Sequence, residues 1–168
     1  LDSKTKKLID DSLTYLEMSQ IEEYSEKYDL RPGMGLSFVQ LGLLERIFVV
    51  SEDLGDNKFN RYVVVNPKVV SQSAEMIYVG EGEGCLSVNR DVEGIVPRHA
   101  RITVDAFDEN GKEFTIRVRE DMAVAFQHEL DHLDGILFVD KIDKKNPYKN
   151  EIFTDQKDFQ EAMARAEV

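Results

Sequence analysis

The chain has 168 residues, of which 42% are hydrophobic and 32% charged, a composition typical of a globular protein rather than a disordered one. This length predicts one compact domain spanning residues 1–168. The formal net charge of −12 argues against a broad surface for nucleic acid, so we expect no DNA partner. No apolar run approaches the roughly 20 residues that span a bilayer, so we expect no membrane segment.

The cysteine content and the start of the chain bear on the cellular compartment. No basic segment followed by an apolar core opens the chain, so no signal peptide is expected. The single cysteine, Cys85, excludes an internal disulfide and suits a reducing environment, which predicts a cytoplasmic protein. Lone cysteines are commonly small buried hydrophobic residues, so a chemical role for Cys85 needs support from other residues. We expect a monomer.

The N-terminal segment, from Ser3 to about Lys27, predicts an amphipathic surface helix. Its apolar residues recur at helical spacing among charged ones, at Ile9, Leu13 and Leu16. The stretch LRPGMGLSFVQ follows, in which Pro32 and two glycines predict a tight loop.

Strand patterns dominate the middle of the chain. Residues 46–50 and 61–67 are β-branched runs separated by a turn-rich segment, and each run predicts a strand. Pro67 lacks a backbone N–H group, so we expect it to end the second strand or to mark the edge of a sheet.

The second half of the chain predicts one hairpin and two helices. Residues 101–108 and 113–120 alternate apolar and polar side chains around an Asn-Gly pair, the strongest short signal for a β-hairpin. Apolar spacing predicts a buried helix over residues 121–134 that stops at Gly135. A last amphipathic helix is expected over about 155–167. The order of the expected strands and helices along the chain predicts an α+β fold, with antiparallel or mixed sheets around the central helix and surface helices at both ends.

The central helix contains QHELDH, in which two histidines stand four residues apart. On a helix this spacing places His128 and His132 on one face, where both imidazoles can bind one ion. Glu129 is rotated by about 100° from His128, which suits a general base better than a metal ligand. The alternative is a pair of hydrogen-bonded histidines without metal, but the glutamate in register favours a metal site.

A catalytic metal centre of this kind needs a third protein ligand. In the metzincin pattern that ligand would fall at Phe138, which cannot bind a metal. A downstream glutamate, Glu151 or Glu161, would lie in a charged tail. His99 and Cys85 remain as candidates, and a thiolate is a strong ligand for zinc or ferrous iron.

Cys85 lies in the segment GEGCLSV, where glycines allow a close approach of the backbone. We expect the chain to re-enter a strand at Leu86 and Ser87. A cysteine, two histidines and a glutamate base would form a coherent hydrolytic site. A cysteine nucleophile is the alternative use of these residues, but it does not account for the glutamate between the histidines.

Three motifs follow one another along the chain: GMGLSFVQ (33–40), EGCLS (83–87) and QHELDH (127–132). In this combination the chain resembles the peptide deformylases from about Arg31 to Asp140. The charged N-terminal segment and the long stretch before EGCLS are similar to the type II class of many Gram-positive bacteria. The resemblance implies a metal-dependent hydrolase that removes the formyl group from N-terminal formylmethionine of newly synthesised proteins and releases formate.

The resemblance also implies roles for individual residues. One divalent ion, Fe²⁺ in most members of the family and Zn²⁺, Ni²⁺ or Co²⁺ as substitutes, would be bound by Cys85, His128 and His132. Glu129 would act as general base while water activated by the metal attacks the formyl carbon, and would then pass its proton to the departing amine. Gln40 and the backbone N–H group of Leu86 would stabilise the oxyanion.

The substrate implied by the resemblance is an N-formylmethionyl nascent peptide. Its methionine side chain needs an apolar slot, which the family pattern would build from Met34, Gly35, Leu86, Val124 and Ala125. A cramped pocket would admit a formyl group and exclude larger acyl groups. A transient ribosome contact is compatible with this acidic chain only as a small local one.

Two further features of the motifs lead to expectations. We hypothesise that Glu83 and Arg98 form a partly buried ion pair that fixes the loop of Cys85, the alternative being an ordinary surface arginine. Ser37 and Phe38 stand where the family usually has two alanines. If the bulky Phe38 packs under the active-site loop, another position must compensate for its volume.

Two other classes of function remain open from the residues alone. An HExxH metallopeptidase would need a third ligand after the helix, and none is usable. A metal-binding module without catalytic activity would be favoured if Glu129 or Gln40 were missing, and both are present.

Overall fold

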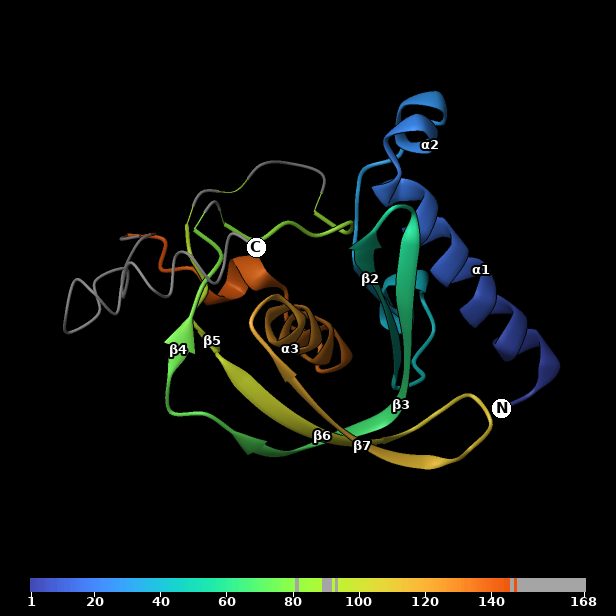
Figure 1. Cartoon of the computed structure of the whole chain (residues 1–168). Coiled ribbons are helices and arrows are strands. Elements are labelled where there is room, and N and C mark those ends of the chain that lie inside the picture. The colour runs from blue at the N-terminus through green and yellow to red at the C-terminus, as the bar shows by residue number, and fades with distance from the viewer. Residues whose placement is uncertain (81, 89–91, 93, 146, 148–168) are drawn as a thin grey trace.

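The computed structural model describes residues 1–80, 82–88, 92, 94–145 and 147 (Figure 1). The larger sheet is antiparallel, with the strand order β1-β2-β3-β6-β7. Its strands are β1 (Gly35–Ser37), β2 (Ile47–Gly55), β3 (Lys58–Gln72), β6 (Arg101–Phe107) and β7 (Glu113–Arg119). A separate ladder pairs β4 (Met76–Ile77) with β5 (Arg98–His99). The helices are α1 (Ser3–Gln20), α2 (Glu22–Lys27) and α3 (Asp121–Leu133), with the 3-10 turns η1 (Phe38–Leu41) and η2 (Phe138–Lys141).

Helix α3 lies in the hollow of the curved larger sheet (Figure 1). The ring of Phe126 on α3 is fully buried and meets the ring of Phe48 on β2 edge to face, with centroids 5.2 Å apart. Alternate residues of the strands complete this core, among them Val50, Val64, Ile102, Val104, Ala106 and Val118. Because buried aromatic side chains contribute strongly to core stability, this packing holds α3 firmly against the sheet.

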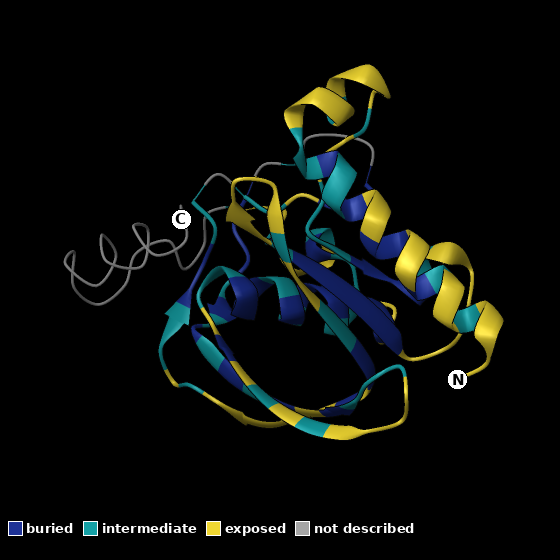
Figure 2. Cartoon of the chain, turned by 45° about the vertical axis from the view of Figure 1, so that its right-hand side comes forward, coloured by how far each residue is buried: buried dark blue, intermediate teal, exposed yellow. Residues whose placement is uncertain are grey.

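Helix α1 covers the other face of the sheet, and Figure 2 shows its buried stripe turned inward and its opposite side exposed. It packs on Ile47 and Val49 of β2 through Ile9, Leu13 and Leu16. Phe48 and Val50, one position along the strand, face α3 instead. Since successive side chains of a strand point to opposite faces, β2 is buried on both sides, which explains its continuous apolar run.

Pro67 does not end its strand, and that expectation was wrong. Strand β3 continues to Gln72, but its pairing with β2 ends at Val65 and its residues from Lys68 to Gln72 pair with β6. The pairing of β3 with β6 shifts register between Val65 and Lys68, so Pro67 falls within an irregularity of the ladder. A bulge of this kind tolerates the missing N–H group of proline.

The predicted helices compare with the structure as follows. The single N-terminal helix is divided, because the backbone of Ile21 is extended and separates α1 from α2. The buried central helix is confirmed as α3, and Gly135 follows it with a φ of 75°. The helix expected over residues 155–167 lies outside the described residues.

The hairpin around the Asn-Gly pair is confirmed, since β6 and β7 pair from Arg101–Arg119 to Phe107–Glu113. The α+β fold with sheets around the HExxH helix is also confirmed, and the observed ladders are antiparallel. No helix in the described part of the chain combines the length and apolar character needed to cross a membrane.

Candidate active site and metal centre

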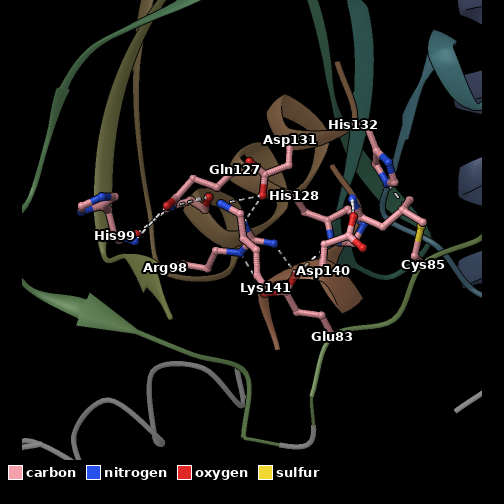
Figure 3. Close-up of polar contacts among 12 residues, drawn as sticks. Glu83, Cys85, Arg98, His99, Gln127, His128, Asp131, His132, Asp140 and Lys141 are labelled. Carbon is pink, nitrogen blue, oxygen red and sulfur yellow. Dashed lines mark hydrogen bonds and ion pairs between the residues drawn. The ribbon is translucent and has the colours of Figure 1, made fainter. Parts of the chain in front are cut away.

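Three potential metal ligands converge at the inner face of α3. His128 and His132 lie one turn apart on the helix, and Sγ of Cys85 is 3.2 Å from Nε2 of His132 (Figure 3). One ligand atom from each of the three residues lies within 4.8 Å of the other two, and all three residues are buried. Ligands about 2.0–2.3 Å from a tetrahedral ion are roughly 3.5 Å apart, so sulfur and nitrogen atoms at this separation fit a divalent ion.

Cys85 lies in a loop and not on a strand, so the expectation that Leu86 and Ser87 re-enter a strand was wrong. The backbone N–H group of Val88 donates to the carbonyl oxygen of Cys85 at 3.0 Å, which closes a tight turn. The N–H group of Ser87 lies 3.4 Å from Sγ of Cys85. The turn thereby presents the sulfur atom toward the histidines, which a straight strand would not do.

A buried ion pair supports this loop and confirms the hypothesis for Glu83 and Arg98. Nε and Nη2 of Arg98 donate to the two carboxylate oxygens of Glu83 at 2.9 and 2.8 Å, and only 2% of Arg98 is exposed. Oε1 of Glu83 also accepts from Nδ1 of His128 at 2.9 Å, which leaves Nε2 of His128 for a metal. The alternative of a surface arginine is therefore wrong.

The rest of this network was not predicted from the sequence. Nη1 of Arg98 donates to Asp131 at 2.6 Å, and Nζ of Lys141 lies 3.0 Å from the same carboxylate (Figure 3). Asp131 stands three residues after His128 on α3, a spacing that places the two side chains next to each other on the helix surface. Arg98 thus joins the loop of Cys85 to the helix that carries both histidines.

The other candidate third ligand lies elsewhere. His99 is on β5, where its Nδ1 is 2.7 Å from the carbonyl oxygen of Ser73. Phe138, in the position of a metzincin histidine, stacks against His128 with ring centroids 5.8 Å apart. Phe138 is buried and closes one side of the histidine pair with apolar surface.

Without a metal ion, contacts among these buried groups shift the pKa values of Cys85 and His128. Burial by itself would raise the pKa of Cys85, but hydrogen bonds with His128 and His132 lower that pKa to about 5. Burial opposes the charged form of His128 as well, yet its contacts with Cys85 and Glu83 raise its pKa to about 10. The arrangement favours a thiolate at Cys85 beside an imidazolium at His128. A bound cation would take the place of the imidazolium proton.

Glu129 points toward β1 and is only 4% exposed. Burial raises the pKa of this carboxyl group, against the opposing effect of the two histidines and Ser37. Oγ of Ser37 donates to Oε2 of Glu129 at 2.8 Å. A β-carbon added at Gly35 would lie 2.9 Å from Oε1, so the carboxylate needs glycine at that position.

Phe38 lies in a core against which Leu86 of the Cys85 loop also packs. The side chain of Phe38 is fully buried, in the core that α1 forms with β2. Ser37 ends β1 and contacts Glu129, whereas Phe38 begins η1 and packs into the core. The core around α1 therefore accommodates the volume of Phe38.

A cavity of about 300 Å³ opens beside these groups and is lined by all five residues expected for the methionine slot, Met34, Gly35, Leu86, Val124 and Ala125. Gln40 also lines it, with Nε2 at 2.7 Å from Oγ of Ser87 and 3.7 Å from Sγ of Cys85. Cys85, His128 and Glu129 lie along the same wall. Arg31, Val79 and Asp121 are lining residues that the sequence analysis missed.

Comparisons with known proteins agree with this geometry. The family model described as polypeptide deformylase matches residues 1–148. The chain is 45% identical to a peptide deformylase of Oceanobacillus iheyensis over 148 residues, which cover 88% of this chain and 81% of the relative. It is 43% identical to peptide deformylase 2 of Bacillus subtilis over 144 residues, or 86% of this chain and 78% of the relative.

Solved structures give the same result. A plant peptide deformylase matches with a TM-score of 0.70 and 28% identity, covering 95% of this chain and 76% of that structure. The peptide deformylase of Thermotoga maritima matches with a TM-score of 0.65 and 30% identity, covering 84% of this chain and 83% of that structure. The chain belongs to the polypeptide deformylase family, metal-dependent hydrolases of protein biosynthesis that remove the formyl group from N-formylmethionine.

Proposed function

We propose that this chain hydrolyses the formamide bond of N-formylmethionyl peptides at a divalent metal ion bound by Cys85, His128 and His132. One observation carries the proposal: a sulfur and two imidazole nitrogens lie within 4.8 Å of one another, beside the buried carboxylate of Glu129. Two histidines and a cysteine leave a fourth position open for water or substrate, as hydrolysis requires.

When bound, the ion would polarise the formyl oxygen and make water a stronger nucleophile at neutral pH. We propose Fe²⁺ as the physiological ion, because it accepts thiolate and imidazole ligands together, with Zn²⁺, Ni²⁺ or Co²⁺ as substitutes. Glu83 would orient His128 through Nδ1, and Arg98 would keep Glu83 charged for that task.

Glu129 would move the protons of the reaction. Its carboxylate would take a proton from the attacking water and later deliver that proton to the nitrogen of the departing methionine. Burial favours the neutral form of Glu129, so a proton taken up at this position is held within the site until the amine leaves.

The oxyanion that develops at the formyl oxygen needs donors on the cavity wall. We assign this task to Nε2 of Gln40 and to the backbone N–H group of Leu86. Oε1 of Gln40 accepts from the N–H group of Ser37 at 2.8 Å, which supports the assignment because it turns the amide nitrogen toward Cys85.

The cavity wall formed by Met34, Gly35, Leu86, Val124 and Ala125 would hold the methionine side chain of the substrate. A cavity of this size suits one unbranched apolar side chain. A formyl group presents only hydrogen beyond its carbonyl, so close contacts near Gly35 and Glu129 would exclude an acetyl group.

We further propose that the chain acts as a single-domain monomer in the cytoplasm on nascent formylated peptides. The lone thiol supports a reducing compartment, because the site needs it as a free thiolate. Contact with the ribosome would be transient and local, since the net charge of −12 opposes a broad contact with RNA.

The proposal is tested by formate release from formyl-Met-Ala-Ser, using protein loaded with Fe²⁺ under reducing, oxygen-free conditions. We expect turnover with this peptide and none with acetyl-Met-Ala-Ser. Glu129→Ala should retain the metal and lose turnover. The absence of formate release from the loaded parent protein, or full activity in Glu129→Ala, would refute the proposed function.

A further inference from the structure

The hydroxyl of Ser37 contacts Glu129 directly and has no task in the mechanism described above. Its Oγ lies 2.8 Å from Oε2 of Glu129 and 3.0 Å from the backbone oxygen of the same residue. The side chain of Ser37 is fully buried. A hydroxyl that donates to a buried carboxylate forms a charge-assisted hydrogen bond, which is stronger than a bond between neutral groups.

The second oxygen of this carboxylate is confined from the same strand. Gly35 and Ser37 stand two positions apart on β1, so both face α3. The backbone of Gly35 leaves so little room that a β-carbon would lie 2.9 Å from Oε1. Gly35 and Glu129 line the cavity, whereas Ser37 is not one of the lining residues. Ser37 therefore lies behind the carboxylate, away from the substrate.

We propose that Ser37 is a positioning residue, which holds Glu129 through Oε2 and leaves Oε1 to exchange protons with the reacting groups. The proposal rests on the proposed function, because it divides the work of Glu129 between its two oxygens. A glutamate side chain has three rotatable bonds, and Ser37 together with Gly35 restricts the last of them. Proton transfer requires the carboxylate within hydrogen-bond distance of the reacting atom, so this restriction raises the fraction of productive geometries.

Replacing Ser37 by alanine removes the hydroxyl from Glu129 and from the capping box that Ser37 forms with Gln40. Ser37→Ala keeps the backbone N–H group that donates to Gln40, so this contact with the proposed oxyanion donor remains. Alanine is also the residue that the related motif usually has at this position, so the fold accommodates it.

Ser51 provides a matched control. It is another fully buried serine on a strand, and its Oγ lies 3.2 Å from a carboxylate oxygen of Glu17 on α1. Ser51→Ala removes the same group from the same kind of contact, outside the cavity.

The test measures kcat and KM for formyl-Met-Ala-Ser, together with metal content, in the Fe²⁺-loaded parent, Ser37→Ala and Ser51→Ala. We expect kcat of Ser37→Ala to fall by about tenfold with KM and metal content unchanged. Both constants of Ser51→Ala should stay within about twofold of the parent values. A parent protein without turnover would refute the proposed function itself, whereas an active parent with an unaffected Ser37→Ala refutes only the positioning role.

A double variant separates positioning from a general structural effect. Glu129→Asp shortens the side chain by one methylene group, so its carboxylate no longer reaches Ser37. In that background, Ser37→Ala should leave the residual kcat unchanged. A tenfold loss in both backgrounds, a loss confined to KM, or a loss of bound metal in Ser37→Ala would overturn the inference.

Discussion

Two buried glutamates lie close to the histidine pair, and their surroundings differ. Glu83, in the loop of Cys85, is held by the guanidinium of Arg98 and by His128. Glu129, on α3 against β1, is held by the hydroxyl of Ser37 and forms no ion pair with a lysine or arginine among the described residues. Burial raises the pKa of both carboxyl groups, but in Glu83 the contacts with His128 and Arg98 outweigh burial and lower it.

This difference separates two tasks for a carboxylate beside a metal. A group that orients a ligand must stay charged, and a neighbouring arginine ensures that it does. A group that takes up and releases a proton must have both protonation states within reach, and a fixed cation would prevent protonation. We therefore propose that the loop of Cys85 is a fixed support and that the α3–β1 contact holds the group that changes protonation state.

The largest effect is expected at the group that changes protonation state. Glu129→Ala should lower kcat by about 10²–10⁴-fold, because it removes the proposed general base while the three proposed ligands remain. Formate release and metal analysis of the same preparation measure the two consequences separately. A variant that loses its metal along with its activity would show that Glu129 belongs to the support instead.

Arg98→Leu should damage the support without removing a metal ligand. The charge of Glu83 would lose its buried partner, which is expected to cost about 3–5 kcal/mol in the free energy of unfolding. Looser orientation of His128 should also weaken metal binding by about 10–100-fold. Urea unfolding and competition with a chelator measure these effects. Unchanged stability and metal affinity would refute the support role of the ion pair.

The thiol of the same loop should titrate far from its ordinary range in the metal-free protein. Contacts with His128 and His132 lower the pKa of Cys85 to about 5, so the thiolate should persist as pH falls from 8 to about 6 and be protonated only near pH 5. Thiolate absorbance near 240 nm follows this titration, with Cys85→Ser as the blank. A midpoint above about 8 would contradict the predicted contacts, since an unperturbed thiol titrates there.

The smallest effect is expected at an exposed arginine beside the C-terminal end of α3. Arg46 lies 3.0 Å from Asp134, and the side chains are 45% and 59% exposed. Arg46→Leu should change the free energy of unfolding by less than about 1 kcal/mol, because solvent screens an exposed pair. Urea unfolding of Arg46→Leu and Arg98→Leu under the same conditions compares the two losses in the free energy of unfolding directly. A loss as large as that of Arg98→Leu would show that burial does not distinguish the two pairs.

Features set by neighbouring residues were predictable from the sequence. The hairpin of β6 and β7 follows from alternation around an Asn-Gly pair, and α3 follows from its apolar spacing. The shared face of His128 and His132 follows from the helical repeat. The break at Ile21 and the course of β3 through Pro67 were not predictable, because they depend on packing and pairing with distant strands.

The sequence by itself determined the local chemistry of this protein: two histidines and a glutamate on one helix, and a cysteine in a glycine-rich segment. Only the tertiary structure decided which oxygen and nitrogen atoms meet. It turned Cys85 toward His132, placed Arg98 between Glu83 and Asp131, and set Ser37 behind Glu129. These pairs are separated by 15 to 92 positions in the chain, so their contacts arise from the folding of the sheet around α3 and not from any local pattern.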